Sequence, residues 1–181
     1  QTVKLNSKKE LLIYSYRLAG TVGLMMAKIL NVENKNALKS AIDLGIAMQL
    51  TNISRDVMED SKNNRFYISS DFDSIKENLK LADLFYESSF TSIKKIPISF
   101  RFAILVARRV YRRIGYNILK KENIENYNNS GKIYVSNISK VFQTFLSIYD
   151  FIFLLLIKSN DHYKQKEHLI INYEINLNVR F

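Results

Sequence analysis

Apolar residues recur every three to four positions along most of this 181-residue chain, a period that is typical of amphipathic helices. Glycine occurs only five times and proline once, so few positions interrupt the pattern. It predicts five helices, over residues 8–30, 36–60, 73–90, 99–121 and 136–158. Outside the C-terminal tail no stretch alternates with the period of a strand. We therefore predict an all-α fold.

Residues between these stretches predict where the helices begin and end. Ser7 is followed three positions later by a glutamate, which is a capping-box pattern, and Asp73 can cap the third helix. Pro97 separates the third helix from the fourth. Residues 61–73 and 123–131 are polar and are interpreted as loops. The inner faces of the second and third helices are expected to carry Leu38, Ile42, Gly45, Met48 and Ile53, and Ile75, Leu79, Ala82 and Tyr86.

The C-terminal part of the chain is harder to interpret. The apolar run 151–157 is shorter than the roughly 20 residues that cross a bilayer, and Asp150 precedes it, so we expect a buried or interfacial helix. Residues 168–181 alternate like a strand but have no partner, and residues 160–181 are treated as a tail of uncertain structure. His162 and His168 have no third ligand at a metal-binding spacing and are assigned no role.

Composition narrows the class of protein only a little. Hydrophobic residues make up 47% and charged residues 24% of the chain, close to globular averages. The absence of cysteine excludes disulfides and cysteine-bound metals. A net charge of +10 favours anionic partners. A helical nucleic-acid binder is the last-ranked alternative, because a bias towards Lys, Asn and Ile can itself produce this charge. A basic stripe at helical spacing comprises Arg108, Arg109, Arg112 and Arg113. It is either a solvated or paired face or a contact for phosphate or lipid.

The second helix carries the candidate chemistry. Asn52, Asp56 and Asp60 recur every four residues and therefore share one helical face. Two carboxylates and an amide can hold Mg²⁺ together with a diphosphate, and Arg55 can contact phosphate oxygens. The alternative is that these acids end a helix in solvent, and their spacing alone does not decide between the two. Residues one turn earlier suit the wall of a pocket: Leu44, Gly45, Met48 and Gln49.

Longer strings favour the first interpretation. YSYRLAGTVGLMMAKIL (14–30) and AIDLGIAMQLTNISRDVMEDSKNNRFYI (41–68) closely resemble the squalene/phytoene synthase family. In that family an AGTVG helix precedes an LGxAxQLTNIxRDVxED helix and an RxYLP-like segment. ARRVYRRIGYNIL and GKIYVSNISK extend the resemblance from Tyr14 to about Ile157. The RDV and IYVS strings look most like the phytoene synthase members.

The resemblance implies an isoprenoid-synthase-type helical bundle around a central cavity. Two facing aspartate-rich helices there bind Mg²⁺, with Mn²⁺ as the alternative ion, and two prenyl diphosphates. In this sequence the second motif implies metal ligands at Asn52, Asp56 and Asp60. It also implies that Arg55 stabilises the departing pyrophosphate and that Gln49 orients the ligand shell. Positions implied to contact substrate are Val22, Gly23, Leu44, Gly45 and Met48.

Further positions follow from the resemblance outside this motif. Tyr14 and Tyr111 correspond to cavity tyrosines that offer ring faces or hydroxyls to allylic cations. Lys132 stands where the family has a diphosphate-binding arginine, and lysine keeps the charge but loses the fork of donors. Ser69 stands where the family usually has proline.

One motif of the family has no counterpart. The first DxxxD motif belongs about a hundred residues upstream of Tyr14 by the resemblance. We therefore expect residues 1–159 to be the C-terminal part of a synthase domain that is incomplete at the N-terminus. Such a part should be inactive on its own.

The resemblance also implies a reaction. It is the head-to-head condensation of two geranylgeranyl diphosphates, through a cyclopropyl diphosphate intermediate, to phytoene for carotenoid biosynthesis. Alternatives are squalene or dehydrosqualene synthesis from farnesyl diphosphate, or a non-catalytic interaction protein of the same fold. We expect a cytoplasmic enzyme that attaches peripherally to the inner face of the membrane and does not bind nucleic acid; its oligomeric state is left open. Side chains expected to set substrate length are Val22, Met25, Met26 and Leu44.

Overall fold

Helices make up almost all of the regular structure in the part of the chain that the computed structural model describes, residues 2–158, 162 and 165–178. The prediction of an all-α fold is confirmed. In chain order the elements are β1 (Val3–Lys4), α1 (Lys8–Ser15), the π-helix η1 (Tyr16–Gly20), α2 (Thr21–Ile29), α3 (Lys35–Lys62), β2 (Arg65–Phe66), α4 (Phe72–Phe90), the 3-10 helix η2 (Thr91–Lys95), α5 (Ile98–Leu119), α6 (Ile124–Asn129), α7 (Asn137–Leu156) and α8 (Lys166–Ile171).

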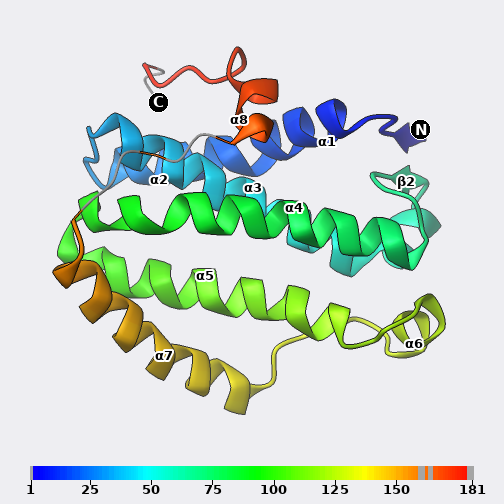
Figure 1. Ribbon diagram of the computed structural model, residues 1–181. Helices are drawn as coiled ribbons and strands as arrows, with labels where there is room; N and C mark the ends of the chain where they lie inside the picture. Colours follow the sequence, from blue (N-terminus) through cyan, green and yellow to red (C-terminus); the bar gives the residue numbers. More distant parts are fainter. Residues whose placement is uncertain (1, 159–161, 163–164, 179–181) are drawn as a thin grey trace.

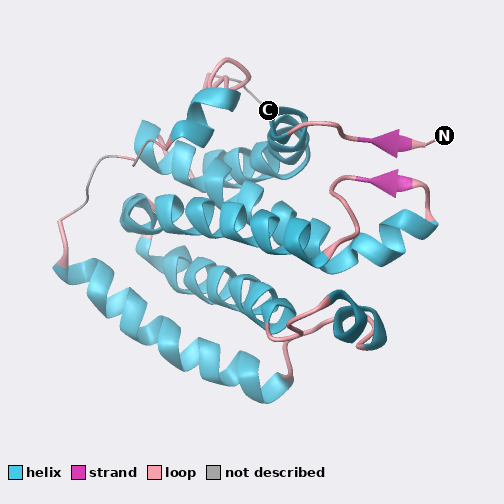
Figure 2. Ribbon diagram, turned by 45° about the vertical axis from the view of Figure 1, so that its right-hand side comes forward, coloured by secondary structure: helices cyan, strands magenta, loops and turns pink. Residues whose placement is uncertain are grey.

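The long helices stack side by side around α3. Figure 1 shows α4 and α5 running alongside each other, with α7 on the outer side of α5 and α1, α2 and α8 at the opposite side of the molecule. Figure 2 shows the same order after a turn of the view. Since α3 packs against α2, η1, α4 and α5, these elements are positioned relative to it, and α7 packs in turn against α5.

The predicted helix starts are partly correct. The Ser7 hydroxyl accepts a hydrogen bond from the Glu10 backbone N–H and caps α1 as expected. The third helix is capped instead by Asp71, whose carboxylate accepts from the Ser74 N–H at 2.7 Å. Asp73 lies inside the first turn and pairs with Lys76. Asp71 and Asp73 are both good capping residues, so local sequence did not distinguish them.

Three segments differ from the sequence interpretation. Residues 124–129, expected to be a loop, form α6. Val3–Lys4 and Arg65–Phe66 pair as two short parallel strands, which are too short to leave a periodic signal. Within the tail, Lys166–Ile171 forms α8 rather than following the strand-like alternation; residues 160, 161, 163, 164 and 179–181 of the tail lie outside the described residues.

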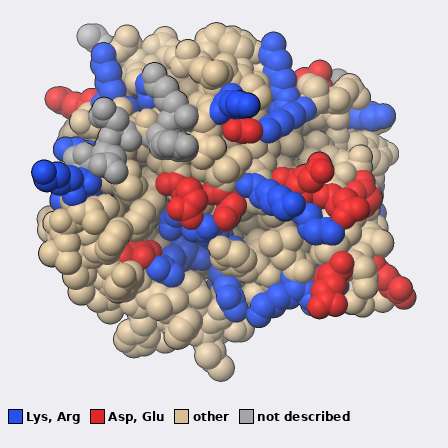
Figure 3. Space-filling view, viewed as in Figure 1, with Lys and Arg blue, Asp and Glu red and all other residues tan. Residues whose placement is uncertain are grey.

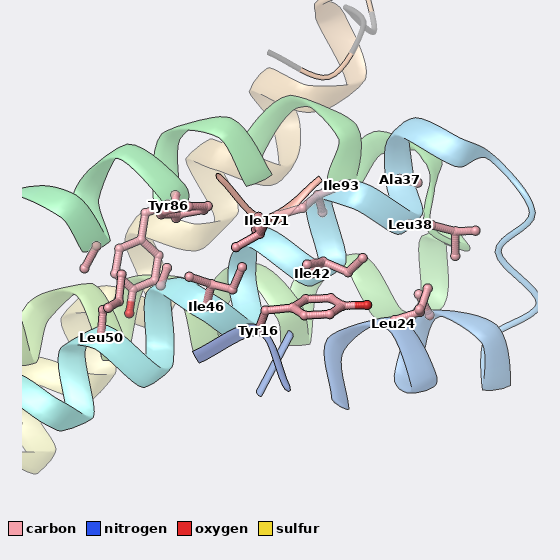
Figure 4. Close-up of a cluster of buried hydrophobic side chains, with 14 of the residues drawn as sticks. Tyr16, Leu24, Ala37, Leu38, Ile42, Ile46, Leu50, Tyr86, Ile93 and Ile171 are labelled. Atoms are coloured by element: carbon pink, nitrogen blue, oxygen red, sulfur yellow. The ribbon is translucent and has the colours of Figure 1, made fainter. Parts of the chain in front are cut away.

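The core lies between α3 and its neighbours. Figure 4 shows Ile42, Ile46 and Leu50 of α3 among side chains from η1, α2 and α4, together with Ile171 of α8. The inner-face residues predicted for the third helix are all buried, as are Leu38, Ile42 and Ile53 of the second. Gly45 and Met48, in contrast, line a pocket.

Two glycines let helix backbones approach closely. A Cβ atom added at Gly45 would lie 2.2 Å from the Ala19 carbonyl oxygen of η1, and one at Gly23 would lie 2.1 Å from the Ala41 carbonyl oxygen of α3. Real Cβ atoms essentially never come this close to another atom. Glycine is therefore required for the contact of α3 with η1 and α2.

The basic stripe on α5 is largely a paired face. Arg108 is buried and donates two hydrogen bonds to the Tyr86 carbonyl oxygen. Arg109 forms a two-pronged ion pair with Asp150 at 2.5 and 2.6 Å, and Arg112 pairs with Asp83 in the same way. These three guanidinium groups hold α5 against α4 and α7, so they are not free to contact a phosphate or a lipid surface.

Helix α7 presents an apolar face to solvent. Ile138, Phe145 and Leu156 are 84%, 65% and 80% exposed, and Figure 3 shows few charged side chains over the lower left of this view. The helix is 20 residues long with a mean hydropathy of 1.4, so by length and composition alone it is able to cross a membrane. The sequence analysis placed a helix over 136–158, close to these bounds, but it compared only the apolar run 151–157 with the length of a membrane span. The ion pair of Asp150 with Arg109 holds the helix along α5.

Candidate functional site

A mostly apolar pocket of about 610 Å³ opens beside α3, within the 300–1,000 Å³ range of typical ligand pockets. Its walls come from η1, α2, α3, η2 and α5. Leu18, Val22 and Met26 are each about half exposed along it. Sequence-predicted residues that line the pocket are Val22, Gly23, Leu44, Gly45, Met48, Gln49, Asn52 and Tyr111.

Apart from Tyr111 of α5, the opposite wall was missed by the sequence analysis. Phe100 and Ile104 of α5 and Ile93 of η2 face the pocket. These residues look like any amphipathic helix face, and nothing local indicates which cavity they meet. Met26 lines the pocket, whereas Met25, which was also expected to set its depth, is not among the lining residues.

The pocket is polar where α3 carries Gln49 and Asn52. Asn52 Oδ1 is buried and has no hydrogen-bond partner in the described part of the chain. An unsatisfied buried acceptor costs about 1–3 kcal/mol. A cation or a ligand hydrogen at this position would remove that cost.

The acidic residues continue the same helix beyond the polar end. Arg55 donates from Nε and Nη2 to the two carboxylate oxygens of Asp56 at 2.9 and 2.6 Å. Lys132 approaches both Glu59, at 2.7 Å, and Asp56, at 3.4 Å. The structure thus brings Arg55, Asp56 and Lys132 together, with the two cations paired to carboxylates.

Asp60 lies in a more repulsive environment. Burial, together with the neighbouring charges of Asp56 and Glu59, raises the pKa of the Asp60 carboxyl above its usual value. A divalent cation would offset both effects, because it favours the charged carboxylate. The orphaned oxygen of Asn52 and the two crowded aspartates are oxygen donors, the ligand type that Mg²⁺ prefers. This residue set therefore fits a divalent cation.

Tyr14 lies beside this cluster and pairs with a second tyrosine. Its hydroxyl is 3.0 Å from that of Tyr67, and the two rings stack with centroids 4.8 Å apart. Burial and the Tyr67 contact raise the pKa of the Tyr14 hydroxyl far above its ordinary value, so this hydroxyl stays protonated. Tyr67 was not chosen from the sequence, although it belongs to the RFYI segment that continues the acidic helix.

Helix α6 supports the acidic end of α3 from outside. The Tyr127 hydroxyl donates to the carbonyl oxygens of Ser54 and Arg55, at 2.9 and 2.8 Å, and its side chain is buried. Carbonyl oxygens inside a helix seldom accept a second hydrogen bond from a side chain of another element. This contact therefore fixes the position of α6 along the axis of α3. Lys132, in the segment after α6, lies near Asp56.

Comparison with known proteins agrees with this geometry. Residues 1–85 match the model of the squalene/phytoene synthase family. The chain is 36% identical to a 15-cis-phytoene synthase of a Paracoccus species in an alignment 129 residues long, which covers 61% of this chain and 42% of that protein. It is 34% identical to the 15-cis-phytoene synthase of Enterobacter agglomerans, of which it covers 43%.

A plant relative matches a longer stretch of the chain. The chloroplastic phytoene synthase 1 of Arabidopsis thaliana is 29% identical in an alignment 160 residues long, which covers 73% of this chain and 37% of that protein. The chain thus spans about two fifths of the length of the relatives that it matches. These matches confirm the resemblance read from the motifs: the chain is related to the squalene/phytoene synthase family and, within it, to proteins named phytoene synthase.

Proposed function

We propose that this chain carries the second aspartate-rich half of the active site of a phytoene-synthase-type prenyltransferase. The observation that carries the proposal is the order of surfaces along α3, where an apolar pocket gives way to an orphaned amide and then to two aspartates. A prenyl diphosphate has the same order, with a long apolar chain and an anionic head. The relatives' printed names support this substrate class.

Each residue then has a chemical role. Asn52, Asp56 and Asp60 would hold Mg²⁺, or Mn²⁺ as the alternative, and the bound ion would supply positive charge that neutralises the diphosphate and favours its departure. Gln49 orients the ligand shell. Arg55 and Lys132 stabilise the departing pyrophosphate, after they exchange Asp56 and Glu59 for phosphate oxygens. Because Arg55 already occupies both oxygens of Asp56, metal and arginine compete for this carboxylate.

The apolar pocket and the tyrosines act on the other part of the substrate. Val22, Gly23, Leu44, Gly45 and Met48 contact the isoprenoid chain and keep water from the allylic cation. Tyr14 and Tyr111 offer ring faces or hydroxyls to that cation. The product is phytoene from two geranylgeranyl diphosphates, with farnesyl diphosphate as the alternative substrate. Because a second metal-binding motif is needed for the second diphosphate, residues 1–181 alone give no product.

We also propose peripheral attachment to the inner face of the cytoplasmic membrane. The exposed apolar face of α7 would enter the interface, and Lys120 and Lys121 would add about 1 kcal/mol each on an anionic surface. Arg108, Arg109 and Arg112 take no part, because they are paired within the fold.

The direct test is mutation of the acidic residues in the full-length synthase. Asp56→Asn and Asp60→Asn are expected to lower turnover of geranylgeranyl diphosphate by orders of magnitude, with far-ultraviolet circular dichroism unchanged. Glu59→Gln is the matched control on the same helix turn, since Glu59 is exposed and pairs only with Lys132 in the described structure; it should retain most activity. Full activity of both aspartate variants would refute the site, and inactivity of the unmodified protein would favour a non-catalytic member of the fold.

A further inference from the structure

A buried cluster far from the acidic site joins the tail to α3. The Asp43 side chain is 2% exposed, and its Oδ2 lies 2.6 Å from His162 Nε2 and 2.9 Å from His168 Nε2. Ser88 of α4 donates to the same oxygen at 2.5 Å. Three segments that are distant in the sequence therefore meet at one carboxylate.

The residue types in this cluster are those of a metal site. One carboxylate and two imidazoles, with ligand atoms within 4.8 Å of one another, are the donors that Zn²⁺ accepts. A histidine bound to metal through Nε2 carries its remaining proton on Nδ1 and donates it to an acceptor. The hydrogen bond of Nδ1 therefore distinguishes a metal ligand from a hydrogen-bond donor.

In His168 the Nδ1 atom accepts a hydrogen bond, whereas in a metal ligand bound through Nε2 it would donate one. The backbone N–H of Gln165 donates to His168 Nδ1 at 2.8 Å, so Nδ1 is an acceptor without a proton. The ring proton of the neutral imidazole is then on Nε2 and points at Asp43. With Nε2 occupied by a proton, His168 is a donor to the carboxylate and not a ligand to a metal.

The charge of Asp43 is consistent with this direction. Burial by itself would raise the pKa of the Asp43 carboxyl, but the hydrogen bonds from His162 and His168 hold it below its usual value. The carboxylate is thus charged, and protein donors satisfy it. His162 Nδ1 is buried without a partner among the residues that the structure describes.

Contacts of the tail show what the cluster fastens. Ile171 is fully buried in the core beside α3. Glu167 pairs with Lys8 of α1 at 2.8 Å, and Glu174 pairs with Arg17 of η1 at 2.9 Å. The π-helix η1 therefore has the tail on one side, and on the other it contributes Leu18 and Ala19 to the pocket.

We propose that Asp43, His162 and His168 form a metal-free hydrogen-bonded clasp that fastens His162 and residues 165–177 over α1 and η1, and that Asp43 and His168 are positioning residues for the pocket wall. The clasp itself is independent of the proposed chemistry; only the use of the pocket by a prenyl chain rests on the proposed function. The tail held by the clasp contacts η1 through the Glu174–Arg17 pair, and α3 contacts η1 where Gly45 lies against the Ala19 backbone.

The tautomer is measured directly. The chain has only two histidines, so nitrogen-15 spectra of their side chains contain two ring systems, and His162→Gln assigns them. We expect His168 to show a protonated Nε2 and a bare Nδ1. A protonated Nδ1 with a bare Nε2, or one equivalent of Zn²⁺ bound by the wild-type chain and lost in His168→Gln, would overturn the clasp in favour of a metal site.

Hydrogen exchange measures the fastening. His168→Ala removes both hydrogen bonds, and amide exchange over 166–171 and over 16–20 should rise roughly tenfold or more, as expected for loss of a hydrogen bond to a charged group. His168→Gln keeps a donor near the Nε2 position and should recover part of the protection, which a metal site would not allow. Glu174→Gln is the control, because its partner Arg17 is exposed and such surface pairs contribute little.

Two exchange results would overturn the proposal. Unchanged protection of 166–171 in His168→Ala would show that the clasp does not fasten the tail. Faster exchange there with unchanged exchange over 16–20 would show that the tail does not position η1. If His168→Ala does not fold, the nitrogen-15 and Zn²⁺ measurements on the wild-type chain and on His168→Gln still decide the question.

Discussion

Substitution of Gly45 by alanine tests whether backbone contact between α3 and η1 shapes the pocket. The new Cβ would meet the Ala19 carbonyl oxygen at 2.2 Å and its carbonyl carbon at 2.7 Å, whereas ordinary contact begins at 3.4 Å. Both atoms are backbone, so no side chain can rotate away. The two helices must separate by about 1 Å, since clashes of this size are relieved only by backbone shifts.

The magnitude follows from two opposing effects. Overpacking of this kind costs about 1–3 kcal/mol, and the rigid obstacle places Gly45→Ala towards the upper end. Alanine in place of glycine in a helix recovers about 1 kcal/mol. We expect a net loss of about 2 kcal/mol, or a fall in Tm of about 4–8 °C for a chain of this length.

Gly115→Ala is the matched control for this experiment. Gly115 is also inside a helix, but its added Cβ would meet only the Leu79 Cδ2 atom, at 3.2 Å, and this side-chain end can move. The same substitution should therefore leave Tm unchanged or raise it there. Thermal and urea unfolding followed by circular dichroism would measure both variants. If Gly45→Ala proves as stable as Gly115→Ala, the close approach of α3 and η1 is not a constraint and the account of the pocket wall is wrong.

Three further predictions concern charge and surface. Asp60→Asn should raise stability by about 0.2–0.5 kcal/mol at neutral pH without metal, because it removes a like-charge pair with Asp56 one helical turn away. Because the pKa of Asp60 is raised in the fold, the wild type should be less stable than Asp60→Asn only above that pKa, and the difference should vanish as acid protonates Asp60. A stability difference that does not depend on pH would contradict this. Asp150→Asn should lower the free energy of unfolding by about 1.5–3 kcal/mol in urea titrations, because Arg109 loses a charged partner; no change would show that the pair does not hold α7. The full-length protein should co-sediment with anionic vesicles at low salt, release at high salt and be extracted by carbonate, whereas carbonate resistance would indicate that α7 spans the bilayer.

The sequence determined those features that depend on neighbours along the chain. Periodicity placed the long helices, and Ser7 capped α1 as its local pattern predicts. The spacing of Asn52, Asp56 and Asp60 put them on one face of α3 before any fold was known. Family motifs added the pocket residues Val22 and Tyr111, which do line one cavity. Local spacing is sufficient here because helix geometry converts it directly into a shared surface.

Tertiary structure alone decided the contacts between distant segments. The sequence placed Arg109 in a basic stripe that was either solvated, paired or a phosphate or lipid contact, and only the fold showed that Asp150 of α7 is its partner. The sequence assigned no role to His168, yet its Nε2 meets Asp43, which is 125 residues away. A charged side chain has many possible partners, and only packing selects one, because burial makes an unpaired charge costly. The local pattern therefore specified the face of α3 that carries the acidic residues, and the fold specified which cations and which tail residues contact that helix.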